Sequence, residues 1–280
     1  MSAAGIATCY LGRYGEAESL DRRALVLDGQ LLGKWHPQTA TDLMNLATVK
    51  TTLTEHSEAE SFYREGVDII TAWYGPEHPD TATYLSILAR TLLLEGKNAE
   101  AETLSEKALK IQERAYGKLH PYVALTLVTL GKLATSRGEL VAAQNDLAHA
   151  VEIDRTLFGD GNHFTAMANV DLAGVYLREG RNTRAEQILR DAVKVLVARF
   201  PPDDAHIGMA RVSWGRSLLR EKRSAEAEKQ LATGYQILAK QAHPPLDQMA
   251  EARQDLVTVY GALKEPEKAA AFRTEIAAAK

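Results

Sequence analysis

Three histidines are the residues of this chain whose type and spacing most suggest metal chemistry. His36, His78 and His120 stand 42 residues apart, and a proline follows each of them. Imidazole nitrogen is a common zinc ligand, but zinc holds its ligands about 2 Å from one centre. In stacked helical units, equivalent residues lie about two helix diameters of roughly 10 Å apart. We therefore expect each histidine to close a joint before a helix with proline in its first turn, and we predict no metal site and no cofactor.

Other candidate motifs for catalysis or ion binding are incomplete. Lys50-Thr51-Thr52 lacks the preceding glycines of a phosphate-binding loop. Gly159-Asp160-Gly161-Asn162 lacks the alternating acids and terminal glutamate of a calcium loop. The many Asp and Glu side chains fall on predicted helix faces, where solubility and pairing between residues i and i+4 explain them. We therefore predict that the chain is not an enzyme.

The spacing of the histidines belongs to a register that runs through the whole sequence. An alanine recurs every 42 residues without slippage, at Ala17, Ala59, Ala101, Ala143, Ala185, Ala227 and Ala269. A fixed period of 20–50 residues indicates one supersecondary unit that is copied and stacked. The chain is therefore expected to build an extended array of units.

Each unit reads as two helices joined by a short turn. Upstream of the six alanines from Ala59 to Ala269 lies an apolar residue followed, in most units, by a small one: Leu46-Ala47, Leu88-Ala89, Leu130-Gly131, Leu172-Ala173, Trp214-Gly215 and Leu256-Val257. A polar or glycine-containing break follows, as in Leu94-Glu95-Gly96-Lys97-Asn98, and apolar residues then resume at the spacing of an amphipathic helix. Small residues are expected where two helix backbones approach closely.

These features resemble tetratricopeptide repeats of the 42-residue type found in kinesin light chains and their bacterial relatives. The resemblance rests on the small pair, the turn, the alanine and a Gly-x-x-His-Pro joint, which reads Gly33-Lys34-Trp35-His36-Pro37, Gly75-Pro76-Glu77-His78-Pro79 and Gly117-Lys118-Leu119-His120-Pro121. It covers essentially the whole chain. It implies an all-α, right-handed superhelical solenoid of about seven antiparallel helix pairs. The units of this single array over 1–280 would be approximately 1–35, 36–77, 78–119, 120–161, 162–203, 204–245 and 246–280.

Composition and charge argue against several classes of binding partner. The net charge of −4 and pI near 6.1 give no general attraction to nucleic acid or to an anionic membrane. No run of about 18 apolar residues predicts membrane insertion. The single cysteine, Cys9, has no internal disulfide partner, which favours a reducing, cytoplasmic compartment.

The first repeat is short. Counting back 42 residues from His36 places its joint before Met1. Ile6, Tyr10 and Leu11 do not resemble the polar cap that normally ends a solenoid. Either the chain starts with an irregular cap, or it is the terminal piece of a longer protein, which is the reading we favour. That protein could carry a Ser/Thr kinase or another signalling domain upstream, and the open repeat would offer a route to self-association. The alanine-rich segment 264–280 is expected to close the other end.

The resemblance implies that the first helix of each unit lines a concave groove. One position before the packed pair, the units carry Asn45, Ile87, Thr129, Asp171, Ser213 and Asp255. Two positions after it, they carry Thr48, Arg90, Lys132, Gly174, Arg216 and Thr258. The second series contains three cations and no anion.

Asn45 matches the asparagine with which the light-chain family binds its peptide, and its amide can donate to and accept from an extended backbone. Arg90 and Lys132, in adjacent units, could hold an acidic side chain or a terminal carboxylate. The candidate peptide-binding residues are Asn45, Thr48, Arg90, Lys132 and Arg216. The leading hypothesis is a non-catalytic scaffold that binds an extended acidic segment of a protein or peptide. The alternative is a regulatory or self-association appendage of a larger signalling protein.

Overall fold

A computed structural model describes residues 14–242 and 244–278, and within these residues it contains thirteen helices and no strand. The chain divides into two compact units, with the division between Leu133 and Ala134. The all-α expectation is confirmed. The expected single array over residues 1–280 stays a prediction, and the inferences about Cys9 and the shortened first repeat concern residues outside the described part.

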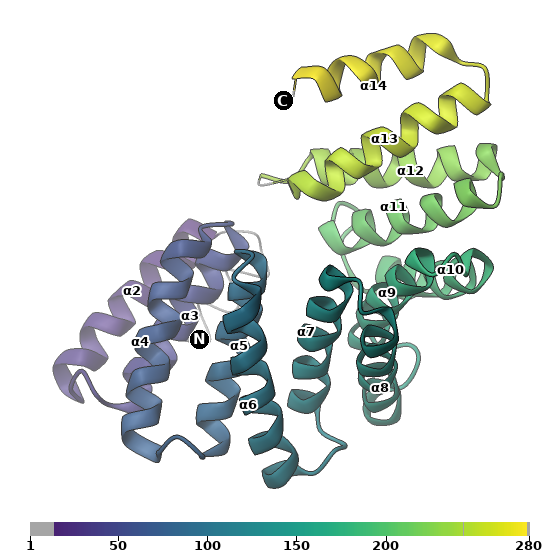
Figure 1. The fold of residues 1–280 in the computed structure, drawn as a ribbon. Coiled ribbons are helices and arrows are strands. Elements are labelled where there is room, and N and C mark those ends of the chain that lie inside the picture. The colour runs from purple at the N-terminus through teal and green to yellow at the C-terminus, as the bar shows by residue number, and fades with distance from the viewer. Residues whose placement is uncertain (1–13, 243, 279–280) are drawn as a thin grey trace. The chain divides into compact units, whose positions relative to one another are not determined.

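Consecutive helices lie side by side from α2 to α6 in the first unit and from α8 to α14 in the second (Figure 1). The first unit contains α2 (Tyr14–Leu31), α3 (Pro37–Thr52), α4 (His56–Tyr74), α5 (Pro79–Leu94), α6 (Asn98–Tyr116) and all but the last turn of α7 (Pro121–Arg137). The second contains that turn, α8 (Leu140–Phe158), α9 (His163–Arg178), α10 (Asn182–Arg199), α11 (Ala205–Arg220), α12 (Ser224–Ala239), α13 (Leu246–Ala262) and α14 (Pro266–Ala278).

The histidines close the joints, as the sequence predicts. His78 precedes α5, and its Nδ1 accepts a hydrogen bond of 3.2 Å from the backbone N–H of Asp80. Pro79 opens the helix, and the His78 ring stacks on Tyr74 with 4.5 Å between centroids. The same Nδ1 bond forms at His36 and His120. Where the histidine is lost, the side-chain oxygens of Asn162 and Asp204 accept the equivalent bond. Each satisfies a helix N–H that has no partner within its own helix.

The periodic alanines are buried, as expected. All seven are at most 1% exposed: Ala17, Ala59, Ala101, Ala143, Ala185, Ala227 and Ala269. A second position of the second helix is also small in the first six repeats and carries Ala24, Gly66, Ala108, Ala150, Ala192 and Gly234. The approach is very close between α11 and α12, where a Cβ added to Gly234 would lie 2.8 Å from the carbonyl oxygen of Gly208. Small residues thus set the distance between paired helices.

Several buried ionisable side chains interrupt this apolar packing, and Lys50 and Asp154 differ in how their burial is compensated. Lys50 is 6% exposed, and its Nζ lies 2.6 Å from Glu55, 3.0 Å from Glu18 and 3.1 Å from Glu58. These hydrogen bonds, with that to Glu55 the strongest, raise the pKa of Lys50. Asp154 in α8 is 7% exposed, and burial raises its pKa to about 6. Lys50 is compensated by its three carboxylates, whereas among the described residues no charged neighbour offsets the burial of Asp154.

Candidate functional site

The helices α3, α5 and α7 are the first helices of successive pairs, and we call their exposed sides in the first unit the first-helix face. Arg90 on α5 and Lys132 on α7 occupy equivalent positions of the repeat, and both side chains are exposed. The only carboxylates on these three helices are Asp42, which is 2% exposed, and Asp80, which lies in the first turn of α5. The later turns of these helices therefore present cations without acidic residues of their own.

The other two candidates in this unit are more enclosed. Asn45 is 7% exposed, so its amide lies below the surface that the sequence pattern suggested for it. The Thr48 hydroxyl lies 2.9 Å from the carbonyl oxygen of Met44, to which it donates, and 3.2 Å from the hydroxyl of Tyr63. Of the four candidates in the first unit, Arg90 and Lys132 are thus the side chains that reach solvent most fully.

Arg216 lies in the second unit and is bound internally. Its guanidinium lies 2.7 Å from Glu251 and 2.7 Å from Asp255, both on α13. Burial lowers the pKa of Arg216, but the two carboxylates outweigh this effect and the pKa is raised. For Asp255 the balance is reversed, because burial raises its pKa more than Arg216 lowers it. Arg216 therefore joins α11 to α13, an arrangement that the sequence pattern did not reveal.

The opposite surface of each unit, formed by the second helices, holds polar residues that the sequence analysis did not single out. One position of the first helix forms the floor between two successive second helices. It carries buried leucines at first and polar side chains later: Leu43, Leu85, Leu127, Asn169, Arg211 and Arg253. Reading this position in the 42-residue register would have found the change from leucine to polar side chains.

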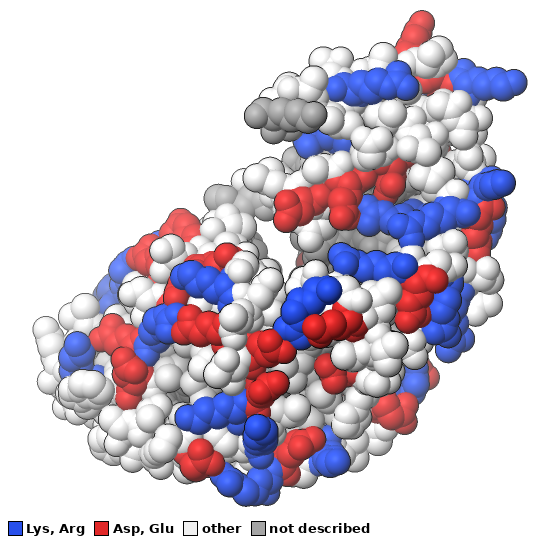
Figure 2. All heavy atoms as spheres, viewed as in Figure 1, with Lys and Arg blue, Asp and Glu red and all other residues white. Residues whose placement is uncertain are grey.

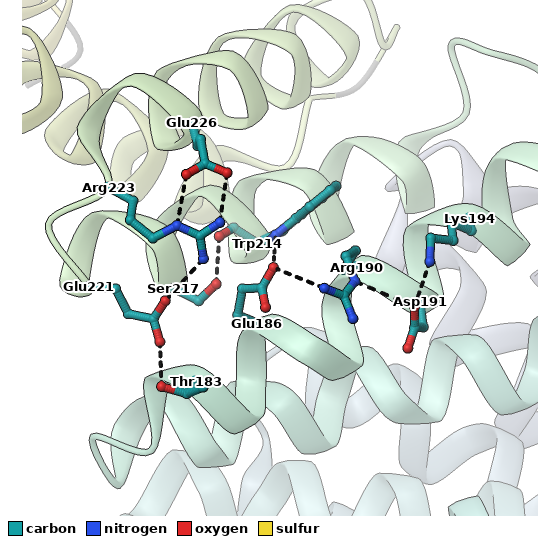
Figure 3. A network of polar contacts seen from close by, with 10 residues as sticks. All are labelled: Thr183, Glu186, Arg190, Asp191, Lys194, Trp214, Ser217, Glu221, Arg223 and Glu226. Atoms are coloured by element: carbon teal, nitrogen blue, oxygen red, sulfur yellow. Dashed lines mark hydrogen bonds and ion pairs between the residues drawn. The ribbon is translucent and has the colours of Figure 1, made fainter.

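Two of these polar floor residues are bonded to the second helices beside them. Arg211 donates to Gln230 of α12 at 2.6 Å. Arg253 lies 3.0 Å from the Tyr235 hydroxyl of α12 and 3.1 Å from Glu275 of α14. Such contacts fill the gap between α10 and α12 above Arg211 and the gap between α12 and α14 above Arg253. Figure 3 shows that Trp214 of α11 also donates a hydrogen bond to Glu186 of α10, at 3.3 Å.

The described residues contain no group of three or more His, Cys, Asp or Glu side chains that could hold a metal ion. Among the described helices, none combines the length and apolar character needed to cross a membrane. Figure 2 shows acidic and basic side chains interleaved over the visible surface of each unit. The polar chemistry of both units therefore consists of dispersed cations, amides and ion pairs, which suit the recognition of another chain.

Comparison with solved structures shows the same kind of fold. BtubC (BKLC) from P. vanneervenii is 18% identical with a TM-score of 0.64, over 82% of this chain and 94% of that one. A putative kinesin light chain of Podosopora anserina is 21% identical with a TM-score of 0.56, over 73% and 97%. The Cut9-Hcn1 hetero-tetramer of the APC/C is 15% identical with a TM-score of 0.69, over 95% of this chain and 45% of that one. Because these sequence identities are low, the similarity shows that the fold is shared.

Sequence comparison identifies the family. No curated protein matches the chain. The tetratricopeptide repeat model matches residues 1–72, 58–110 and 86–156, which together cover more than half of the 280 residues. The helix pairs, the capped joints and the buried small residues are the features on which that family is built. The chain belongs to the tetratricopeptide repeat family.

Proposed function

We propose that this chain is a non-catalytic scaffold that binds an extended acidic peptide segment across the first-helix face of its first unit. The observation that carries the proposal is the exposure of Arg90 and Lys132 on helices whose later turns hold no exposed carboxylate. Exposed cations attract a ligand carboxylate and guide its approach to the surface.

Spacing sets a limit on the ligand. Arg90 and Lys132 are equivalent residues of neighbouring first helices, which lie about one to two helix diameters of roughly 10 Å apart. An extended peptide rises about 3.3 Å per residue. Two acidic side chains about three to six residues apart would therefore reach both cations. Asn45 and Thr48 line the same series of helices and could take part if a ligand displaces their local contacts.

Arg216 is expected to contribute less to ligand binding than Arg90 and Lys132. Its ion pairs with Glu251 and Asp255 would have to be replaced before it could bind a ligand carboxylate. The acidic ligand is therefore assigned to the first unit, through Arg90 and Lys132.

Charge reversal tests the assignment. The double variant Arg90→Glu, Lys132→Glu should lose binding to fluorescent peptides with two glutamates three to six residues apart, measured by anisotropy at low salt. The matched control is Arg23→Glu, Lys110→Glu, which makes the same charge change at exposed positions of α2 and α6. The control should bind as the parent does, and both variants should melt within a few degrees of it. Equal binding by the two double variants would refute the assignment.

The alternative, a self-association or regulatory appendage of a larger protein, depends on residues 1–13, which lie outside the described part. Light scattering over a range of chain concentrations tests it, because self-association would raise the mean mass with concentration, while a scaffold for other chains would keep a constant mass.

A further inference from the structure

A groove runs between α8 and α10 on the second-helix side of the second unit, with α9 as its floor. Two adjoining depressions of about 570 and 250 Å³ follow it. Both are lined by Asn169 of α9 and Ile188 of α10. The groove lies wholly within the second unit.

Equivalent gaps in the first unit are closed by ion pairs between successive second helices. Arg22 of α2 lies 2.9 Å from Glu58 of α4, and one repeat later Arg64 of α4 lies 2.8 Å from Glu100 of α6. In the α8–α10 groove, the residues equivalent to Arg64 and Glu100 are Ala148 and Arg184. An alanine therefore stands where Arg184 would need an acid, and the exposed Arg184 makes no hydrogen bond or ion pair within the described residues.

Asn169, which forms the floor of the groove, also lacks a hydrogen-bond partner among the described residues. Asn169 takes the place of the buried Leu85 and Leu127, and unlike Arg211 and Arg253 it makes no hydrogen bond to the described residues. Its amide and the Arg184 guanidinium line the same depression. The amide can donate and accept at once, whereas the guanidinium offers a forked pair of donors that fits a carboxylate.

One end of the groove is blocked. Arg181 Nη1 donates to Gln144 of α8 at 3.0 Å, and its guanidinium lies 4.3 Å from the centre of the Tyr176 ring. This contact crosses from the start of α10 to α8, one helical turn beyond Arg184 and Ala148. A chain lying in the groove would have to end beside Arg184.

The other end opens beside the joint at Asp160, and its charges are already paired. Arg155 lies 2.7 Å from Asp160, and Lys194 lies 2.8 Å from Asp191, a pair that Figure 3 shows on α10. From Arg184 to Lys194 the helix advances ten residues, or about 15 Å at 1.5 Å per residue. At about 3.3 Å per residue of extended chain, this length takes four to five residues.

We propose that the α8–α10 groove binds the C-terminal four or five residues of another protein as an extended strand, with the terminal carboxylate on Arg184 and the peptide backbone on the Asn169 amide. Ile188 and Leu172 supply the apolar lining against which a side chain of the bound segment packs. This site is separate from the first-helix face, and it requires a free carboxylate at the end of the ligand.

Two peptide libraries provide the test. One holds fluorescent hexapeptides with free C-terminal carboxylates and the last four positions randomised, and the other holds the same sequences as C-terminal amides. The immobilised chain should enrich carboxylate peptides, and their amides should bind at least about tenfold more weakly in anisotropy titrations, because a charge-assisted contact is lost.

Variants assign the binding to the groove. Ala148→Glu supplies Arg184 with the acid that it lacks, so it should abolish peptide binding without lowering the melting temperature. Arg184→Gln should weaken binding at least about tenfold. Asn169→Leu, which restores the leucine of the earlier repeats, should weaken binding while the fold is kept. The matched control is Arg273→Gln, an exposed arginine of α14, which should bind as the parent does.

Each contrary result overturns a stated part of the proposal. Equal affinity for carboxylates and amides would show that the terminus is not recognised. Parent-like binding by Ala148→Glu would place the ligand outside the groove, and an absence of carboxylate binders up to 1 mM peptide would refute the site. The Arg90→Glu, Lys132→Glu variant should keep this binding, so the outcome is independent of the first-helix face.

Discussion

Replacing Gly234 by alanine should destabilise the second unit, whereas the same replacement at Gly174 should stabilise it. Both glycines lie within helices, α12 and α9. A Cβ at Gly234 would meet the Gly208 carbonyl oxygen at 2.8 Å and the Val212 backbone nitrogen at 2.9 Å, while a Cβ at Gly174 meets nothing within 4 Å. The first clash is with backbone, which cannot rotate away.

Helix propensity and packing together determine how each glycine-to-alanine substitution changes the free energy of unfolding. Alanine favours a helix over glycine by about 0.8–1.0 kcal/mol, and Gly174→Ala should gain most of this. At Gly234 the same gain is opposed by overpacking, which typically costs about 1–3 kcal/mol and should lie near the upper end against backbone atoms. The expected result is a net loss of about 1–2 kcal/mol at Gly234. The two variants should therefore differ by about 2–3 kcal/mol.

Calorimetry and urea titration at pH 7 measure the difference. At about 2–4 °C per kcal/mol for a domain of this size, Gly174→Ala should melt a few degrees above the parent and Gly234→Ala a few degrees below it. Gly66→Ala is an intermediate case, because the nearest atom to its Cβ belongs to the Tyr84 ring, at 3.3 Å, which can shift. If Gly234→Ala proved as stable as Gly174→Ala, the close approach of α11 and α12 would be wrong.

Ala101→Leu should cost about 1–3 kcal/mol in urea unfolding, because this 0%-exposed position has no room for a larger side chain, and unchanged stability would contradict its placement. Lys50→Met should cost about 2–4 kcal/mol at pH 7, because three glutamates lose their shared cation, and the loss should shrink in acid as Glu18 and Glu58, whose pKa values are lowered in the folded protein, are protonated. Asp154→Asn should stabilise the chain by up to about 3 kcal/mol at pH 7.5, from two pKa units at 1.36 kcal/mol each. The raised pKa means that the folded state keeps a proton that the unfolded state releases between about pH 4 and 6, so this contribution favours folding below pH 4 and is lost as the pH rises through 6. The gain from Asp154→Asn should accordingly vanish at pH 4, and an equal gain at both pH values would refute the assignment.

The sequence was sufficient for the fold because its signals are local and periodic. The alanine register marks buried contacts that recur in every helix pair, and the His-Pro joints mark helix starts that the structure confirms. Two later joints lack the histidine, and Asn162 and Asp204, both of residue types that commonly cap helices, take its place. Reading residue types at the position of the lost histidine would have identified them.

The sequence was less informative about the candidate sites because they depend on contacts between distant residues. Arg216 looks like an available cation along its own helix, but its two acids come from α13, 35 and 39 residues later. Asn45 is polar and matches a family motif, yet its surroundings bury it. The α8–α10 groove arises from a missing acid at Ala148, and such an absence becomes visible only when equivalent pairs are compared in space.

The glycine contact between α11 and α12 bears on how this repeat array can change through recombination. Exchange of a whole repeat carries Gly208 and Gly234 together and preserves their fit. A crossover in the turn between α11 and α12 would instead join α11 to a second helix with alanine at the equivalent position, as at Ala108, Ala150 or Ala192. That methyl group would fall 2.8 Å from the Gly208 carbonyl oxygen. Equal repeat length therefore permits exchange between repeats, but the boundaries at which exchange leaves a foldable chain are set by the backbone contact inside this helix pair.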